Sequence, residues 1–262
     1  MASSGNFFKT VRVTVLLVIL AAVGANTWLS KQRATDWQHP LRIVIYPING
    51  DGSTVADDYV RSLNAADFTP IERFFRREMR RYGIENEFPL FIQVAPTVSS
   101  LPPPLPADQG VLKVMLWSLQ LRLWAFRVDD YQGPTPEVRL FVQYFDPERV
   151  KRLDHSLGLE KGMIGVIKAF ASTKLAARNN VVITHELLHT LGATDKYDLR
   201  TNQPRFPDGY ADPQWKPLYP QRRAEIMAGR IPRSPAEAVI PHGLDETIVG
   251  PATAGEIRWT RS

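Results

Sequence analysis

Two histidines and a glutamate in the second half of the chain have the types and spacing that metal chemistry requires. Residues 185–189 read HELLH, which sets His185 and His189 four positions apart. Residues four apart on a helix lie on the same face, so both imidazoles can bind one metal ion. Glu186 follows the first histidine and can take a proton from a water on that ion. The motif therefore predicts metal-dependent hydrolysis.

A helix is expected to carry this motif. Apolar residues surround the histidines from Val181 to Leu191. Asn179 or Asn180 is expected to cap the start of the helix, and Gly192 is expected to end it.

Two protein ligands do not complete a catalytic metal site, which usually has three and a water. Gly192 can let the chain leave the helix in a left-handed turn, which would return Asp195 to the metal from another direction. Asp198 is a second acid within reach. Glu225 is a third candidate, because another class of zinc peptidases takes its last ligand from a distant glutamate.

Residues 185–195, HELLHTLGATD, resemble the signature of the metzincin zinc endopeptidases, H-E-x-x-H-x-x-G-x-x-H. Aspartate stands here in the place of the last histidine. That difference resembles the small snapalysin-like branch, which uses an aspartate as the third zinc ligand. A carboxylate oxygen is an acceptable zinc ligand.

Residues 224–229, AEIMAG, resemble the turn that places a methionine beneath the metal in this family, with Met227 as that methionine. The resemblance implies one catalytic zinc ion and a phenol that stabilises the oxyanion. The implied zinc ligands are His185, His189 and Asp195, with Glu186 as the general base and Gly192 and Met227 as structural residues. The candidate phenols are Tyr197, Tyr210 and Tyr219, although tyrosines in such a region are more often packing residues.

The remaining sequence predicts the elements that must position this site. Strands are expected at 41–46, 89–94, 119–128, 138–145 and 163–170. A helix is expected to begin at the sequence Thr69-Pro70-Ile71-Glu72 and to stop at Gly83, and another could start at 111–117. The last third is rich in proline and has little periodicity.

These elements predict an α/β (α+β) fold. The resemblance implies a twisted, five-stranded, mostly parallel sheet with helices, an active-site helix and a loop-rich C-terminal lobe. The expected catalytic domain is 34–262, with an upper lobe at about 40–192 and a lower lobe at about 193–262. A peptide would pair with an edge strand in the cleft between the lobes, at 138–145 or 163–170.

Residues 1–33 are predicted to be a membrane anchor or a signal segment. Residues 13–29 carry no charge. The length of this segment is near the shortest that spans a bilayer as a helix. The small residues at 23–25 would suit a signal peptidase. Either outcome places the bulk of the chain outside the cytoplasm, in the cell envelope or periplasm if the anchor is retained. The protein is expected to be a single-pass membrane protein, or a secreted one if the segment is cleaved.

Composition excludes several classes of function. The 262 residues contain no cysteine, which rules out disulfides, thiolate nucleophiles and cysteine zinc sites. The net charge of +5 is too small to indicate a nucleic-acid partner. Nothing in the sequence indicates an oligomeric state.

The function expected from these features is a zinc-dependent endopeptidase that hydrolyses peptide bonds of envelope or extracellular proteins. One alternative is a zinc amide hydrolase that acts on a cell-wall or lipid-linked substrate, favoured if the arginine-rich face of the 69–83 helix borders the cleft. Another is a non-catalytic envelope binding module with a metalloprotease fold.

Overall fold

The computed structural model describes residues 35–106, 110–153, 157–159 and 163–260, together with Arg12 and Thr14. Apart from those two positions, the predicted anchor or signal segment lies outside the described residues. In the part of the chain that is described, no helix is both long enough and apolar enough to cross a membrane.

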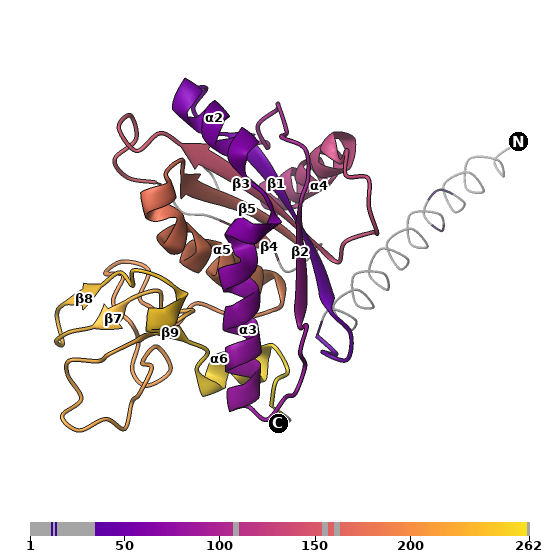
Figure 1. Ribbon diagram of the computed structural model, residues 1–262. Coiled ribbons are helices and arrows are strands. Elements are labelled where there is room, and N and C mark those ends of the chain that lie inside the picture. Colours follow the sequence, from indigo (N-terminus) through magenta and orange to yellow (C-terminus); the bar gives the residue numbers. More distant parts are fainter. Residues whose placement is uncertain are drawn as a thin grey trace, which may run out of the picture.

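A five-stranded sheet with the order β2-β1-β3-β5-β4 forms the centre of the structure (Figure 1). Four strands are parallel: β1 (Leu41–Asn49), β2 (Leu90–Val94), β3 (Val138–Phe145) and β5 (Ile164–Phe170). The short β4 (Leu157–Leu159) pairs antiparallel with β5. The parallel strands are apolar along most of their length because both faces of the sheet are covered. The prediction of a mixed α/β fold around a mostly parallel sheet is confirmed.

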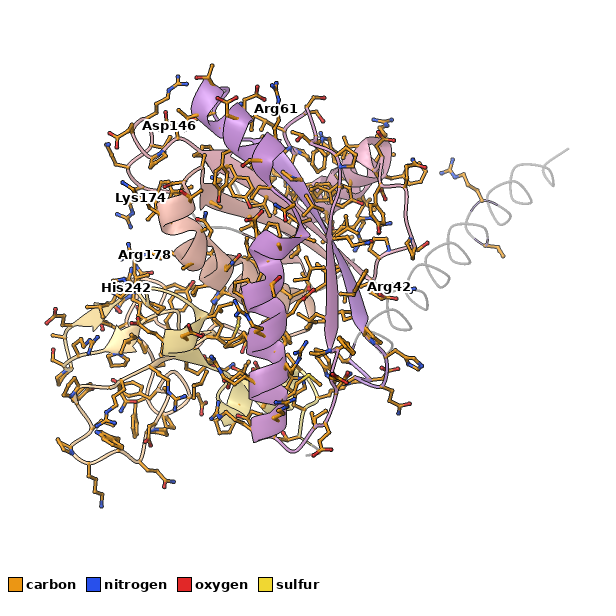
Figure 2. The ribbon with its side chains drawn as sticks, in the orientation of Figure 1. Arg42, Arg61, Asp146, Lys174, Arg178 and His242 are labelled. Carbon is orange, nitrogen blue, oxygen red and sulfur yellow. The ribbon has the colours of Figure 1, made fainter. Side chains whose placement is uncertain are left out.

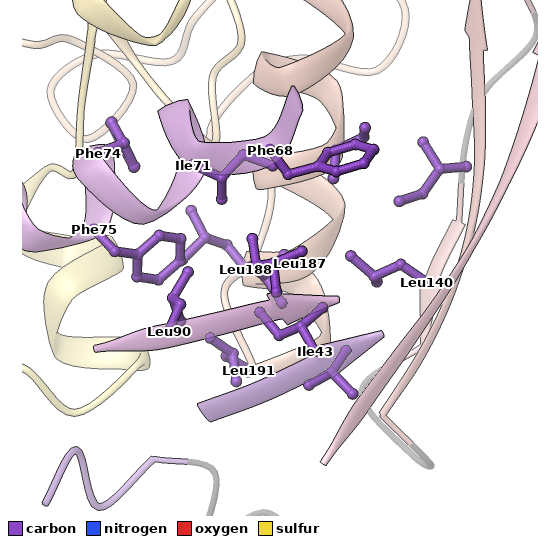
Figure 3. Close-up of a cluster of buried hydrophobic side chains, with 14 of the residues drawn as sticks. Ile43, Phe68, Ile71, Phe74, Phe75, Leu90, Leu140, Leu187, Leu188 and Leu191 are labelled. Carbon is purple, nitrogen blue, oxygen red and sulfur yellow. The ribbon is translucent and has the colours of Figure 1, made fainter. Parts of the chain in front are cut away.

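Helices cover the two faces of the sheet in separate layers. On one face, α2 (Thr54–Ser62), α3 (Thr69–Arg81) and α5 (Ala176–Thr190) share a hydrophobic core with the strands. Figure 3 shows side chains of the α3 region and of α5 meeting over the sheet. On the other face, α4 (Val111–Val128) packs in a second, smaller core. Short 3-10 helices at Ala65–Phe68 and Thr173–Leu175 lead into α3 and α5.

The chain after α5 is mostly loop. Its short strands form two pairs. A 3-10 helix precedes the last strand, and the short helix α6 follows that strand. These elements are β6 (Ala224–Glu225) with β9 (Thr247–Ile248), β7 (Ile231–Pro232) with β8 (Ala238–Val239), the 3-10 helix Leu244–Glu246, and α6 (Pro251–Glu256).

The predicted strand at 119–128 is wrong, because these residues continue α4. Alternation of leucines with polar neighbours suggested a strand. The side chains buried against the sheet instead recur every four residues, at Trp117, Leu121 and Ala125. That spacing belongs to a helix.

The expected edge strands are also wrong. β3 lies between β1 and β5, and β5 lies between β3 and β4, so the edges are β2 and β4. The long apolar runs that suggested strands at 138–145 and 163–170 are apolar because these strands are interior.

The helix α3 begins at Thr69 and ends at Arg81, before Gly83 with its φ of 72°, as predicted. The expected cap does not form, because the chain enters α3 directly from a 3-10 helix. Glu72 accepts a hydrogen bond from the backbone of Ile92 instead, which joins α3 to β2.

Candidate metal centre

The helix α5 presents the two histidines of the motif on one side and buries the other side in the core. Leu187 and Leu188 are fully buried, whereas the side chains of His185 and His189 keep 14% and 19% of their exposure. The helix starts earlier than predicted, at Ala176, so the expected caps lie inside it.

Asn179 and Asn180 hold α5 in place rather than capping it. The side chain of Asn179 exchanges two hydrogen bonds with the backbone of Phe170, at the end of β5. Asn180 donates to the carbonyl oxygen of Asp67. These bonds fix α5 against the sheet and against the 3-10 helix that leads into α3, and so fix where the histidines point.

A left-handed residue returns the chain to the histidines after α5. Gly192 has a φ of 104°, a conformation that glycine adopts without strain, and Ala193 donates back to the carbonyl oxygen of Leu188. Asp195 then lies beside both imidazoles. The predicted role of Gly192 as the end of the helix is confirmed.

Three ligand atoms converge. Oδ1 of Asp195 lies 3.2 Å from Nε2 of His185 and 3.1 Å from Nε2 of His189, and the two Nε2 atoms are 3.0 Å apart. The corners of such a triangle lie about 1.8 Å from its centre, which is close to the usual ligand distance of about 2.0–2.2 Å, so the three atoms could share one ion. These three residues therefore form a group that could hold a metal ion.

Hydrogen bonds of the two Nδ1 atoms orient both imidazole rings so that their Nε2 atoms face the cluster. Nδ1 of His185 lies 3.0 Å from the carbonyl oxygen of Ile226, and Nδ1 of His189 lies 2.8 Å from that of Ala193. A carbonyl oxygen only accepts, so both Nδ1 atoms carry a proton, and the Nε2 atoms are the ones that could bind an ion. Backbone partners of this kind are typical of metal-ligating histidines.

Without an ion, a proton takes its place between the ligands. Burial lowers the pKa of His185, but the Asp195 carboxylate, the charge of Glu186 and the Ile226 carbonyl outweigh it and raise the pKa to about 9. Burial tends to raise the pKa of Asp195, but both histidines hold it well below its ordinary value. The cluster thus attracts a positive charge.

Glu186 and His185 both line a cavity of about 820 Å³. The side chain is buried, with 6% exposure. A carboxylate next to a metal ligand and open to a cavity of this size can exchange a proton with a water or a substrate there.

The turn that contains Met227 lies behind His185 and is held by Glu225. Both carboxylate oxygens of this buried glutamate accept hydrogen bonds, Oε2 from the backbone of Met227 and Ala228, and Oε1 from Gly250 and the hydroxyl of Thr253. Glu225 is therefore a structural residue and not a ligand of the cluster. Met227 itself is fully buried.

Asp198 also lies outside the cluster. Its carboxylate accepts hydrogen bonds from the backbone of Arg200 and Thr201, which closes its own turn. Of the two aspartates weighed from the sequence, only Asp195 faces the histidines.

Of the three candidate tyrosines, only Tyr197 is among the described residues that line the cavity. Tyr197 lines the cavity, and its ring centre is 6.4 Å from that of His185. Burial, with the charges of Asp195 and Glu186, raises the pKa of Tyr197, so its hydroxyl keeps its proton. Tyr210 and Tyr219 bond each other at 2.7 Å and are not among the described lining residues.

The cavity is strongly basic, which the sequence did not indicate. Among the described lining residues, Glu186 is the only acid, against five basic residues: Lys151, Arg152, Lys168, Arg178 and Arg230. Arg178 contacts His242 where α5 meets the C-terminal part of the chain (Figure 2). These residues come from four separate segments, so no local pattern could have revealed them. The described lining includes none of the α3 arginines that favoured an amide hydrolase.

A buried lysine supports the loop of the third ligand. Lys196, next to Asp195, bonds both carboxylate oxygens of Glu256 in α6 at 2.7 and 2.8 Å. Its backbone donates to the carbonyl oxygen of Met227. The loop that carries Asp195 is thus fastened to the methionine turn and to α6.

No protein-family model matches this chain, and a comparison with curated proteins finds no matching relative. The assignment of a function therefore depends on the site itself.

Proposed function

We propose that this protein is a zinc-dependent endopeptidase of metzincin-like design. The observation that carries the proposal is the convergence of two histidine Nε2 atoms and one aspartate oxygen, with both histidine tautomers fixed by backbone carbonyls. Two imidazoles and a carboxylate with an adjoining glutamate are a donor set that suits catalytic zinc.

The ligands would be His185, His189 and Asp195. The chemistry that a bound zinc ion supplies is Lewis acidity, which polarises a carbonyl group and lowers the pKa of water. Glu186, on the cavity wall, would take the proton of the attacking water on its carboxylate and deliver it to the leaving amine.

Tyr197 is the best placed of the candidate phenols. Its protonated hydroxyl can donate a hydrogen bond to the oxyanion that develops when water attacks the peptide carbonyl. Arg230 lies close enough for its charge to lower the pKa of this tyrosine and would support the same negative charge.

The charge of the cavity favours acidic peptides as substrates. The basic side chains on the wall, of which Lys151 is paired with Glu148, raise the local concentration of anionic ligands and strengthen their binding. The proposed substrates are therefore unfolded or extended protein segments rich in aspartate and glutamate, in the cell envelope or outside it.

Metal analysis together with peptide hydrolysis tests this function. The full chain and its Glu186→Ala variant are purified without chelators, analysed for bound metal, and assayed on an unfolded acidic protein. We expect about one zinc ion per chain in both proteins, because Glu186 is not a ligand. Hydrolysis is expected only in the wild type, with a loss of at least about 10²-fold in the variant.

Two results would contradict the proposal. A folded protein that takes up no metal after incubation with zinc would refute the metal site. Zinc at full occupancy without hydrolysis of any unfolded protein would show a binding module instead.

A further inference from the structure

The helix α4 exposes a continuous apolar face. Six large apolar side chains on it are between 49% and 81% exposed: Leu112, Met115, Leu116, Leu119, Leu123 and Phe126. At 100° per residue, all six fall within an arc of about 100° on the helix surface. The opposite side of α4 packs on the sheet through Trp117, Leu121 and Ala125. The helix is therefore apolar both toward the core and toward solvent.

Single exposed apolar residues are ordinary, but a contiguous apolar surface on a protein marks a place of contact. Phe91 of the edge strand β2 is a further exposed apolar residue on the same side of the sheet as α4. It alternates with Leu90 and Ile92, which face α3, so it points to the α4 side of the sheet, and it is 53% exposed.

The charges on α4 indicate what the face contacts. Its sequence contains no aspartate or glutamate. The basic residues Lys113, Arg122 and Arg127 fall on the two flanks of the apolar arc by helical position. An apolar stripe with cationic flanks and no acidic residue is typical of a helix that lies in the interface of an anionic membrane.

We propose that α4 docks this protein on a bilayer that contains anionic lipids. Its apolar stripe would enter the boundary between headgroups and acyl chains, while Lys113, Arg122 and Arg127 meet lipid phosphates. A second copy of the chain is a poorer occupant, because two such faces would bring like charges together on both flanks.

The predicted anchor would keep the described domain close to a bilayer, although Trp37, near its start, packs in the core on the α3 side of the sheet. Only residues 30–34 separate the apolar segment 13–29 from Thr35, the first residue of the described domain. The six Cα–Cα steps from residue 29 to Thr35 span at most about 20 Å, so an anchored chain would hold its domain near the bilayer surface.

Docking through α4 leaves the candidate metal centre accessible. α4 covers one face of the sheet, whereas α5, which carries His185 and His189, covers the other (Figure 1). The cavity beside α5 would then open away from the lipid, toward soluble or extended protein segments.

Vesicle binding tests the proposal on a chain that begins at residue 34. All residues of both hydrophobic cores lie between Trp37 and Trp259, so this chain keeps every one of them. Sedimentation with vesicles of phosphatidylcholine and phosphatidylglycerol should show binding, and pure phosphatidylcholine should bind less. The double variant Leu116→Glu, Leu119→Glu should bind about 100-fold more weakly. The matched control Leu199→Glu, Phe206→Glu changes two equally exposed apolar residues elsewhere and should bind like the wild type.

The absence of cysteine allows a second, positional measurement in the full chain. A fluorophore on Leu119→Cys should be quenched by spin-labelled lipid in reconstituted bilayers, and one on Leu199→Cys should not. Equal binding of the two double variants, or no lipid quenching at position 119, would overturn the proposal. A label at 119 that is shielded in a dimer without lipid would show instead that the face binds protein.

Discussion

Nδ1 of His185 donates a hydrogen bond to the carbonyl oxygen of Ile226 at 3.0 Å, across 41 positions of sequence. This bond joins α5 to the turn that buries Met227. It also fixes the tautomer in which Nε2 faces Asp195. The turn therefore supports the candidate metal centre, although none of its side chains belongs to the cluster of His185, His189 and Asp195.

Glu225→Gln should weaken both the fold and the metal site. A glutamine offers one acceptor oxygen and an NH₂ group, so two of the four donors that meet Glu225 would lose their acceptor. We expect a loss of about 2–4 kcal/mol in urea unfolding. Zinc affinity should fall about tenfold, because the Ile226 carbonyl moves with the turn. The exposed Glu237→Gln serves as the control, and equal effects of both would refute this role.

Asp195→Ala should abolish tight metal binding, whereas Asp198→Ala should not. Asp195 supplies one of the three converging atoms, and Asp198 only closes its own turn. Competition with a chromophoric chelator should show a loss of zinc affinity of at least about 100-fold for the first variant alone. The reverse order would make Asp198 the ligand.

Zinc affinity should rise with pH. The metal-free protein keeps a proton on His185 until about pH 9, so an ion must displace this proton at lower pH. The apparent affinity should therefore increase about tenfold per pH unit between about pH 6.5 and 8.5. Calorimetry in buffers of different ionisation enthalpy should show proton release on binding. A constant affinity over this range would contradict the assignment.

The free energy of unfolding of the metal-free protein should fall as the pH rises. The pKa of His185 is raised from 6.5 to about 9, so its stabilising contribution is complete below pH 6.5 and is lost as the pH rises through 9. The lowered pKa of Asp195 stabilises the fold above pH 3.8 and does not change over that window. Urea unfolding at several pH values should show the decline in the wild type and not in Asp195→Ala.

Glu256→Ala should destabilise the fold by about 3 kcal/mol, because it leaves the ammonium group of Lys196 buried without its carboxylate. The double variant Lys196→Met, Glu256→Ala should recover part of this loss. In the exposed pair of Lys151 and Glu148, Glu148→Ala should change stability too little to measure. Additive effects of the two substitutions at 196 and 256 would show that the pair is not coupled.

Basic residues of the cavity should determine substrate preference. The double variant Arg152→Gln, Arg178→Gln should raise KM for an acidic peptide about tenfold and leave the KM for a neutral peptide of equal length unchanged. Arg80→Gln, Arg233→Gln, which changes no described lining residue, is the control. A similar KM change for both peptides would mean that charge does not select the substrate.

The convergence of His185, His189 and Asp195 could be predicted from the sequence because it is local. A helical turn relates the first two, and one left-handed glycine brings in the third. The cavity charges could not be predicted, since they meet only through the packing of the sheet, α5 and the C-terminal loops.

α4 shows why hydrophobic periodicity sometimes fails. A helix is normally recognised by one apolar and one polar face. Here the side toward the core and the side toward solvent are both apolar, which removes that contrast and leaves a local alternation of leucines. The feature that misled the prediction of a strand is the same exposed stripe for which we propose a membrane contact.

The bond from Lys196 to Glu256 spans 60 positions and ties the loop of the third ligand to α6. During synthesis, a chain that has released α5 but not α6 from the ribosome already contains both histidines. It still lacks the anchor of the loop that brings in the aspartate. His185, His189 and Asp195 are therefore held in their final arrangement only after α6 has been synthesised and has packed beside Lys196.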